Sequence, residues 1–73
     1  MENLQNQVLQ LLNNKNYLSE VEISKSLDTK RSLIRARLNT CYKNGLIEPA
    51  TGARNASAFY VITQKGISAL EGT

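Results

Sequence analysis

The residues best suited to chemistry in this 73-residue sequence are basic, and they cluster in its second half. Five Lys or Arg residues and no acidic residue lie between Thr29 and Ile47. Residues 29–73 carry a summed charge of +5, whereas residues 1–28 sum to −2. A solvated helix face would normally intersperse both signs of charge. The one-sided clustering therefore indicates a surface that binds a polyanion.

The sequence offers little for catalysis or for metal binding. It has no His, and its one Cys cannot form an internal disulfide. Paired carboxylates at a plausible site, a Gly-rich phosphate loop and an activated nucleophile are also missing from the pattern. We therefore predict a protein that is not an enzyme and uses no cofactor or metal. Cys41, at an apolar helix position, is interpreted as a small core residue.

The length and the apolar pattern indicate one small domain over residues 1–73. Polar residues interrupt the N-terminal apolar run, which argues against a signal peptide, and no stretch approaches the roughly 18 apolar residues that a membrane span needs. We expect a cytoplasmic protein with no membrane partner and no small-molecule ligand.

Three helices are predicted in the first two thirds of the chain. Leu4, Val8, Leu11 and Leu12 form the apolar stripe of a helix over 2–13. Ser19 followed by Glu22 is a capping-box pattern that predicts a second helix over 20–27. The third helix, over 30–43, is capped by Asp28 or Thr29, buries Ile34, Leu38 and Cys41, and ends at Gly45 in a left-handed position. A short turn before a basic second helix is typical of a helix-turn-helix.

The remaining residues predict a hairpin and a last helix. Tyr17-Leu18 is a candidate minimal strand. Leu46-Ile47-Glu48 is a short extended run, residues 51–57 form a loop, and residues 58–62 are rich in strand formers, so a hairpin spans 46–62. Thr63 caps a helix over 64–70 that Gly66 weakens. The fold class is mainly α with a small β-hairpin (α+β), in the order α-α-α-β-β-α.

The helix over 30–43 supplies most of the candidate contact residues. With its apolar residues facing the core, Arg31, Ser32, Arg35 and Asn39 project outward. Arg31 and Arg35 are the candidates for reading guanine, because a guanidinium fork can bond both O6 and N7. Asn39 fits either adenine or a phosphate. Lys30 at the helix start and Lys43 in its last turn complete this set.

Residues outside that strip leave alternatives open. Arg54, at the tip of the hairpin, suits a minor-groove or phosphate contact beside Asn55, or is an ordinary solvated loop residue. Arg37 lies nearer the core side of the wheel, which favours a structural or partner-contacting role. Leu33 fits a thymine methyl contact, an oligomer contact or simple exposure. Tyr42 and Tyr60 are interpreted as packing residues.

Residues 23–47, which end in Asn-Gly-Leu-Ile, resemble the winged helix-turn-helix of bacterial regulators such as the MarR and PadR groups. Phe59-Tyr-Val-Ile-Thr-Gln-Lys-Gly66, followed by Leu70, resembles the Tyr-x-Leu-Thr-x-x-Gly-x-x-x-Leu that closes many such domains. The likeness covers roughly residues 4–70. It departs at Asp28, where many relatives have Gly, and no long terminal helices are present. It therefore implies the DNA-reading module and not a ligand-sensing repressor.

These observations lead to a first hypothesis of a bacterial or phage protein that binds double-stranded DNA in a sequence-specific way. It would act as a small transcriptional regulator, as a homodimer or as tandem copies on DNA. The second hypothesis is a winged-helix module that binds protein, as an adaptor or inhibitor, with little DNA binding. The pattern leaves open the DNA site, the choice between activation, repression, replication and packaging, and the oligomeric state.

Overall fold

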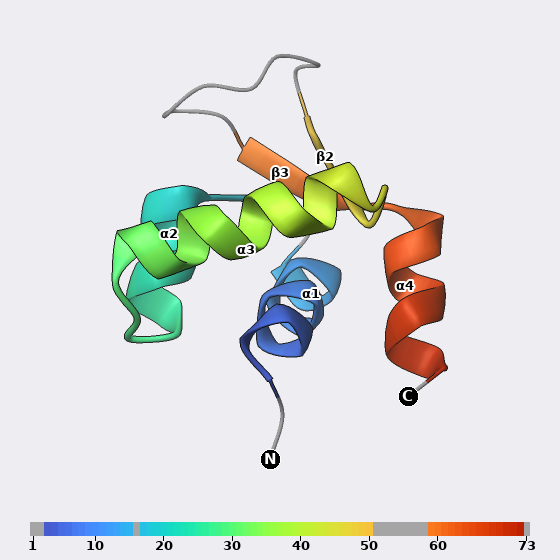
Figure 1. Cartoon of the computed structure of the whole chain (residues 1–73), viewed down its shortest axis with the longest axis horizontal. Coiled ribbons are helices and arrows are strands. Elements are labelled where there is room, and N and C mark those ends of the chain that lie inside the picture. Colours follow the sequence, from blue (N-terminus) through green and yellow to red (C-terminus); the bar gives the residue numbers. More distant parts are fainter. Residues whose placement is uncertain (1–2, 16, 51–58, 73) are drawn as a thin grey trace.

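The computed structural model describes residues 3–15, 17–50 and 59–72, which form four helices and three short strands. The order is α1 (Leu4–Lys15), β1 (Leu18–Ser19), α2 (Glu20–Ser26), α3 (Arg31–Lys43), β2 (Ile47–Pro49), β3 (Phe59–Ile62) and α4 (Gln64–Glu71). This confirms the predicted α-α-α-β-β-α order, and the candidate minimal strand at Tyr17-Leu18 is present one residue later as β1. In Figure 1, α3 crosses the molecule, with α2 at one end and α4 near the other.

The helix limits differ from the sequence-based ones mostly by one or two residues. The first helix was expected to end at 13, but α1 continues through Asn14 to Lys15. The expected cap of the third helix was wrong. Lys30 is the N-cap residue and makes no side-chain capping bond, while Thr29 donates its hydroxyl to the Leu27 carbonyl. The capping box of α2 is confirmed, with Ser19 and Glu22 bonding each other's backbone N–H.

The three strands form one antiparallel sheet with β3 in the centre. Tyr60 of β3 lies opposite Leu18 of β1 on one side and Pro49 of β2 on the other. Pro49 is tolerated because β2 is an edge strand. The β2–β3 pairing confirms the predicted hairpin, whereas its tip, residues 51–57, lies outside the described residues.

One hydrophobic core joins the helices to the sheet. α1 packs on α3, α4 and β3, so it lies at the centre of these contacts. The predicted core residues Ile34, Leu38 and Cys41 are all buried. Leu9 is also fully buried although it was not part of the predicted stripe, whereas Leu11 is only partly buried. The remaining buried apolar residues are Val8, Leu12, Leu18, Ile23, Leu46, Ile47 and Tyr60.

The same backbone device ends α2 and α3. At the end of α3, Gly45 has a φ of 76°, its N–H donates to the Tyr42 carbonyl, and the N–H of Leu46 donates to Cys41. At the end of α2, Asp28 has a φ of 50°, and its N–H donates to the Lys25 carbonyl. These are Schellman caps, which need a left-handed residue. Asp28 thus adopts the left-handed conformation, which a short polar side chain tolerates better than most L-residues.

Candidate nucleic-acid interface

The outer face of α3 carries part of the predicted set of contact residues. Ile34, Leu38 and Cys41 hold the opposite side of this helix in the core. Ser32, Ala36, Asn39 and Lys43 are spaced at i, i+4, i+7 and i+11, so they share one ridge of the helix. Along this ridge Ser32, Ala36 and Lys43 are exposed and Asn39 is partly exposed. The structure therefore brings three of the predicted contact residues together on one outward ridge.

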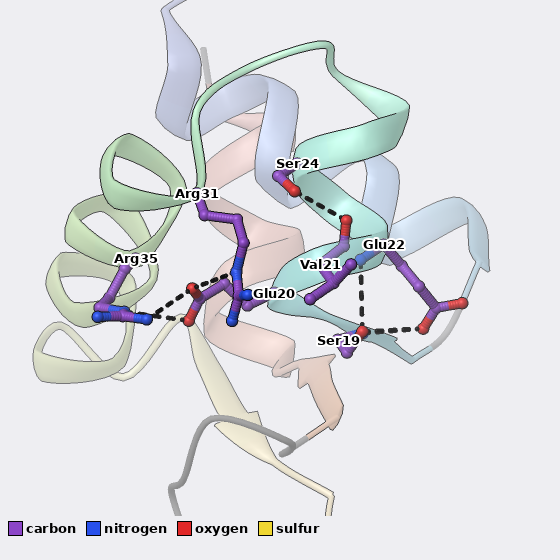
Figure 2. A network of polar contacts seen from close by, with 7 residues as sticks. All are labelled: Ser19, Glu20, Val21, Glu22, Ser24, Arg31 and Arg35. Atoms are coloured by element: carbon purple, nitrogen blue, oxygen red, sulfur yellow. Dashed lines mark hydrogen bonds and ion pairs between the residues drawn. The ribbon is translucent and has the colours of Figure 1, made fainter.

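Arg31 and Arg35 lie on a flank of α3 rather than on that ridge, and both contact Glu20 of α2. The Nε of Arg31 donates to Glu20 Oε1 at 3.2 Å. Arg35 donates through Nε to Oε2 at 3.3 Å and through Nη2 to Oε1 at 3.2 Å. Figure 2 shows the Glu20 carboxylate between the two guanidinium groups. A single acid on one helix thus holds two cations on the next.

The three charged groups differ in their exposure to solvent. The Glu20 side chain is only 8% exposed, whereas those of Arg31 and Arg35 are 48% and 58% exposed. A buried carboxylate needs charged or hydrogen-bonding partners, and the two arginines supply them. Both guanidinium groups nevertheless remain on the surface, where a large anion can reach them.

Glu20 is the site residue that sequence reasoning missed. It is the first residue of α2, and acidic side chains at this end of a helix are favourable for the helix dipole. The acidic residue ahead of the turn was visible in the sequence, but its pairing with Arg31 and Arg35 depends on the packing of α2 against α3. The spacing of 11 and 15 residues carries no local signal for such a contact.

The other predicted residues are distributed around this site. Lys30 and Arg37 are exposed at the start and in the middle of α3. Leu33 is 52% exposed. The packing role predicted for Tyr60 is confirmed, because this residue is buried, but Tyr42 is 41% exposed. The candidate hairpin-tip residues Arg54 and Asn55 lie outside the described residues.

Cys41 lies on the buried face of α3, and this position makes its thiol unreactive. Burial raises the pKa of its thiol from 9.0 to about 11, and the nearby positive charge of Arg37 only partly opposes this rise. Because the thiolate is the reactive form of cysteine, a raised pKa suppresses reaction. The predicted role of Cys41 as a small core residue agrees with this position.

Two further features concern the residues in the described ranges. None of the helices there is both long and apolar enough to cross a bilayer. Over the same ranges, no three His, Cys, Asp or Glu residues gather in a way that could hold a metal ion.

No protein-family model matches the sequence, and no curated protein matches it either. Solved structures do match the fold. Wild-type apo MarR from E. coli superposes with a TM-score of 0.84 at 18% identity, covering 99% of this chain and 54% of MarR. A cysteine-to-serine variant of the same MarR complexed with operator DNA gives a TM-score of 0.80 at 18% identity, covering 99% of this chain and 52% of that one.

A second solved protein, MepR, also superposes on nearly the whole length of this chain. The complex of S. aureus MepR with DNA superposes with a TM-score of 0.80 at 22% identity, covering 99% of this chain and 53% of MepR. The chain therefore spans about half the length of the solved structures that it matches. Their shared fold agrees with the resemblance seen in residues 23–47 and 59–70. The chain has the winged helix-turn-helix fold of MarR.

Proposed function

We propose that this chain is a cytoplasmic, sequence-specific DNA-binding module of a small transcriptional regulator, with α3 in the major groove. The observation that carries the proposal is the exposed surface of α3, where Arg31, Arg35 and Lys43 accompany Ser32 and Asn39 without an exposed acid on the same helix. The same fold in MarR and MepR has been solved with DNA, which supports this choice of polyanion.

The proposed contacts divide by chemistry. Arginine guanidinium groups match guanine O6 and N7, and Asn39 suits adenine or a phosphate. Lys30 and Lys43, at the two ends of α3, are proposed to contact phosphates and to set the position of the helix on DNA. Arg54 and Asn55 are proposed to contact the minor groove or the backbone. Since one domain reaches only about five phosphates, two copies on neighbouring half-sites are proposed to bind together.

The experiment that tests this function is selection of bound duplexes from a random DNA pool, followed by binding measurements on the selected duplex. Removing both arginines alone would leave the buried Glu20 carboxylate without partners. The informative variant is therefore the triple substitution Glu20→Gln/Arg31→Ala/Arg35→Ala. It is expected to lose at least about fivefold in affinity for the selected duplex, which corresponds to the lower end of the about 1–3 kcal/mol for a lost bidentate base contact.

Lys15→Ala is the matched control, because it removes a positive charge from the end of α1 and leaves α3 intact. It is expected to bind the selected duplex like the wild type at moderate salt. The proposed function is wrong if the wild-type chain retards no duplex at low salt. Capture of a defined protein partner in that case would favour the protein-binding module.

A further inference from the structure

Glu20 contacts both arginines that the proposed function places on DNA. Its Oε1 accepts from Arg31 Nε and Arg35 Nη2, and its Oε2 accepts from Arg35 Nε, all between 3.2 and 3.3 Å. We propose, on the basis of that function, that Glu20 is a positioning residue that makes DNA reading sequence-selective. It does so by fixing which edges of the two guanidinium groups are left for DNA.

The two arginines are held in different ways, and this assigns them different tasks. Arg35 lies side-on to the carboxylate, because its Nε and Nη2 bond the two oxygens in a bidentate pair. Arg31 engages Glu20 through Nε, so its Nη1–Nη2 edge is the one left for a ligand. That edge can bond guanine O6 and N7 together. Arg31 is therefore the base reader, and Arg35 supports it and contacts the backbone through Nη1.

A fixed guanidinium discriminates better than a mobile one. An unrestrained arginine can follow whichever phosphate or base is nearest, and it loses rotamer freedom when it is ordered on DNA. Because Arg31 Nε is already bonded to a buried carboxylate, part of this rotamer freedom is lost before DNA binds. The entropic cost of binding is therefore lower, but only for DNA that fits the orientation in which the side chain is held. The tethered Arg31 therefore favours the matching base over alternatives.

The charge of Glu20 acts in the same direction. A carboxylate near the interface weakens the attraction of the two arginines for every phosphate equally, whatever the sequence of the DNA. Non-specific binding is mostly electrostatic, so it is lowered more than binding to the matching site. Orientation and charge together raise the ratio of specific to non-specific affinity.

The test compares Glu20→Gln with Glu71→Gln in the full chain, using the selected duplex and a scrambled duplex of equal length. Both substitutions remove one negative charge, but Glu71 is exposed at the end of α4. Glu20→Gln is expected to lower the specific-to-scrambled affinity ratio about tenfold, the loss expected when one bidentate base contact is misplaced. It should bind the scrambled duplex at least as tightly as the wild type, while Glu71→Gln should keep the wild-type ratio.

A ratio in Glu20→Gln equal to that of the wild type overturns the proposal and leaves DNA binding itself intact. If the wild type retards no duplex, the proposed function fails, and Glu20 positioning fails with it. Should Glu20→Gln not fold, NMR of the wild type decides. The Nε–H signals of Arg31 and Arg35 are expected to stay protected from exchange with water in the DNA complex. Loss of that protection on binding would show that DNA displaces Glu20, which contradicts a positioning role.

Discussion

Gly66, in the first turn of α4, lies directly against the main-chain carbonyl of Leu46. A Cβ at Gly66 would overlap that oxygen and would lie 2.6 Å from Ile62 Cγ1. Neither neighbour is the free end of a flexible side chain. The start of α4 therefore sits on the segment that joins α3 to β2, and only glycine permits this approach.

We expect Gly66→Ala to destabilise the protein, although alanine is the better helix former by about 1 kcal/mol. Overpacking of this kind typically costs about 1–3 kcal/mol, and here the backbone of Leu46 has to move. Urea unfolding followed by circular dichroism measures the change. Ser68→Ala, at an exposed position of α4, is the control and should not lower stability. A Gly66→Ala protein as stable as the wild type would show that the two segments can separate at little cost.

Two hydrogen bonds of Thr63 connect the start of α4 to the segment between α3 and β2. Its hydroxyl donates to the Gly45 carbonyl at 2.6 Å and accepts from the N–H of Gly66 at 3.1 Å. Thr63→Val keeps the shape and removes both bonds, so a loss of about 1–3 kcal/mol is expected from the cap and the unpaired groups. Thr63→Ser should recover most of the stability in thermal unfolding. Little loss in Thr63→Val together with a large loss in Thr63→Ser would instead assign the effect to packing of the methyl group.

Asp28 carries the left-handed conformation at the end of α2, with a φ of 50°. An L-residue in this region is disfavoured by about 1–2 kcal/mol, less for Asp and Asn, whereas glycine adopts it freely. We expect Asp28→Gly to stabilise the protein by about 0.5–1 kcal/mol and Asp28→Val to destabilise it by at least about 1 kcal/mol. Asp28→Asn separates charge from conformation and should resemble the wild type. If Asp28→Asn stabilised the protein as much as Asp28→Gly, the gain would come from removing the negative charge and not from relieving the backbone conformation.

Cys41 is expected to be almost inert in the folded protein. Its pKa is raised from 9.0 to about 11, so at pH 8 the folded state contains about a hundredfold less thiolate than the unfolded chain. Alkylation by iodoacetamide should be slower in buffer than in urea by at least this factor, since burial also restricts access. Comparable rates in the two conditions would place the thiol at the surface.

The same raised pKa gives a pH dependence of stability. The folded state retains the Cys41 proton at pH values where the unfolded chain has lost it. The resulting stabilisation is complete below about pH 9 and is lost as the pH rises towards 11. The difference in stability between the wild type and Cys41→Ala should therefore narrow between these two pH values. A stability difference between the two proteins that stays constant over this pH range would show that folding does not raise the pKa of the Cys41 thiol.

The DNA binding proposed for this chain should depend steeply on salt. About five phosphate contacts give a slope of log affinity against log salt near −4 to −5. The phosphate contact proposed for Lys43 predicts that Lys43→Ala makes the slope shallower by about 1 and weakens binding to all duplexes alike, since a phosphate contact carries no sequence information. Fluorescence anisotropy at several salt concentrations measures both effects. A change confined to the selected duplex would instead make Lys43 a base reader.

The sequence by itself determined the element order and most of the core. Those features depend on local chemistry: the Ser19–Glu22 capping box, the apolar spacing of α3 and the left-handed Gly45 are each defined within a few residues. The basic character of α3 was equally readable. Limits such as the end of α1 were less accurate, because the polar residues after Leu12 continue the helix as an exposed last turn, where the positive charge of Lys15 is favourable for the helix dipole.

Only the tertiary structure decided how the basic residues are presented. A helical wheel placed Arg31 and Arg35 outward with Ser32 and Asn39, but it does not include the neighbouring helix. The packing of α2 against α3 brings the buried Glu20 between the two arginines, through contacts 11 and 15 residues apart in the chain. The close approach of Gly66 to Leu46 depends on tertiary packing in the same way. Local periodicity fixes which face of a helix is apolar, whereas the partners of a polar flank depend on which segments the fold brings beside it.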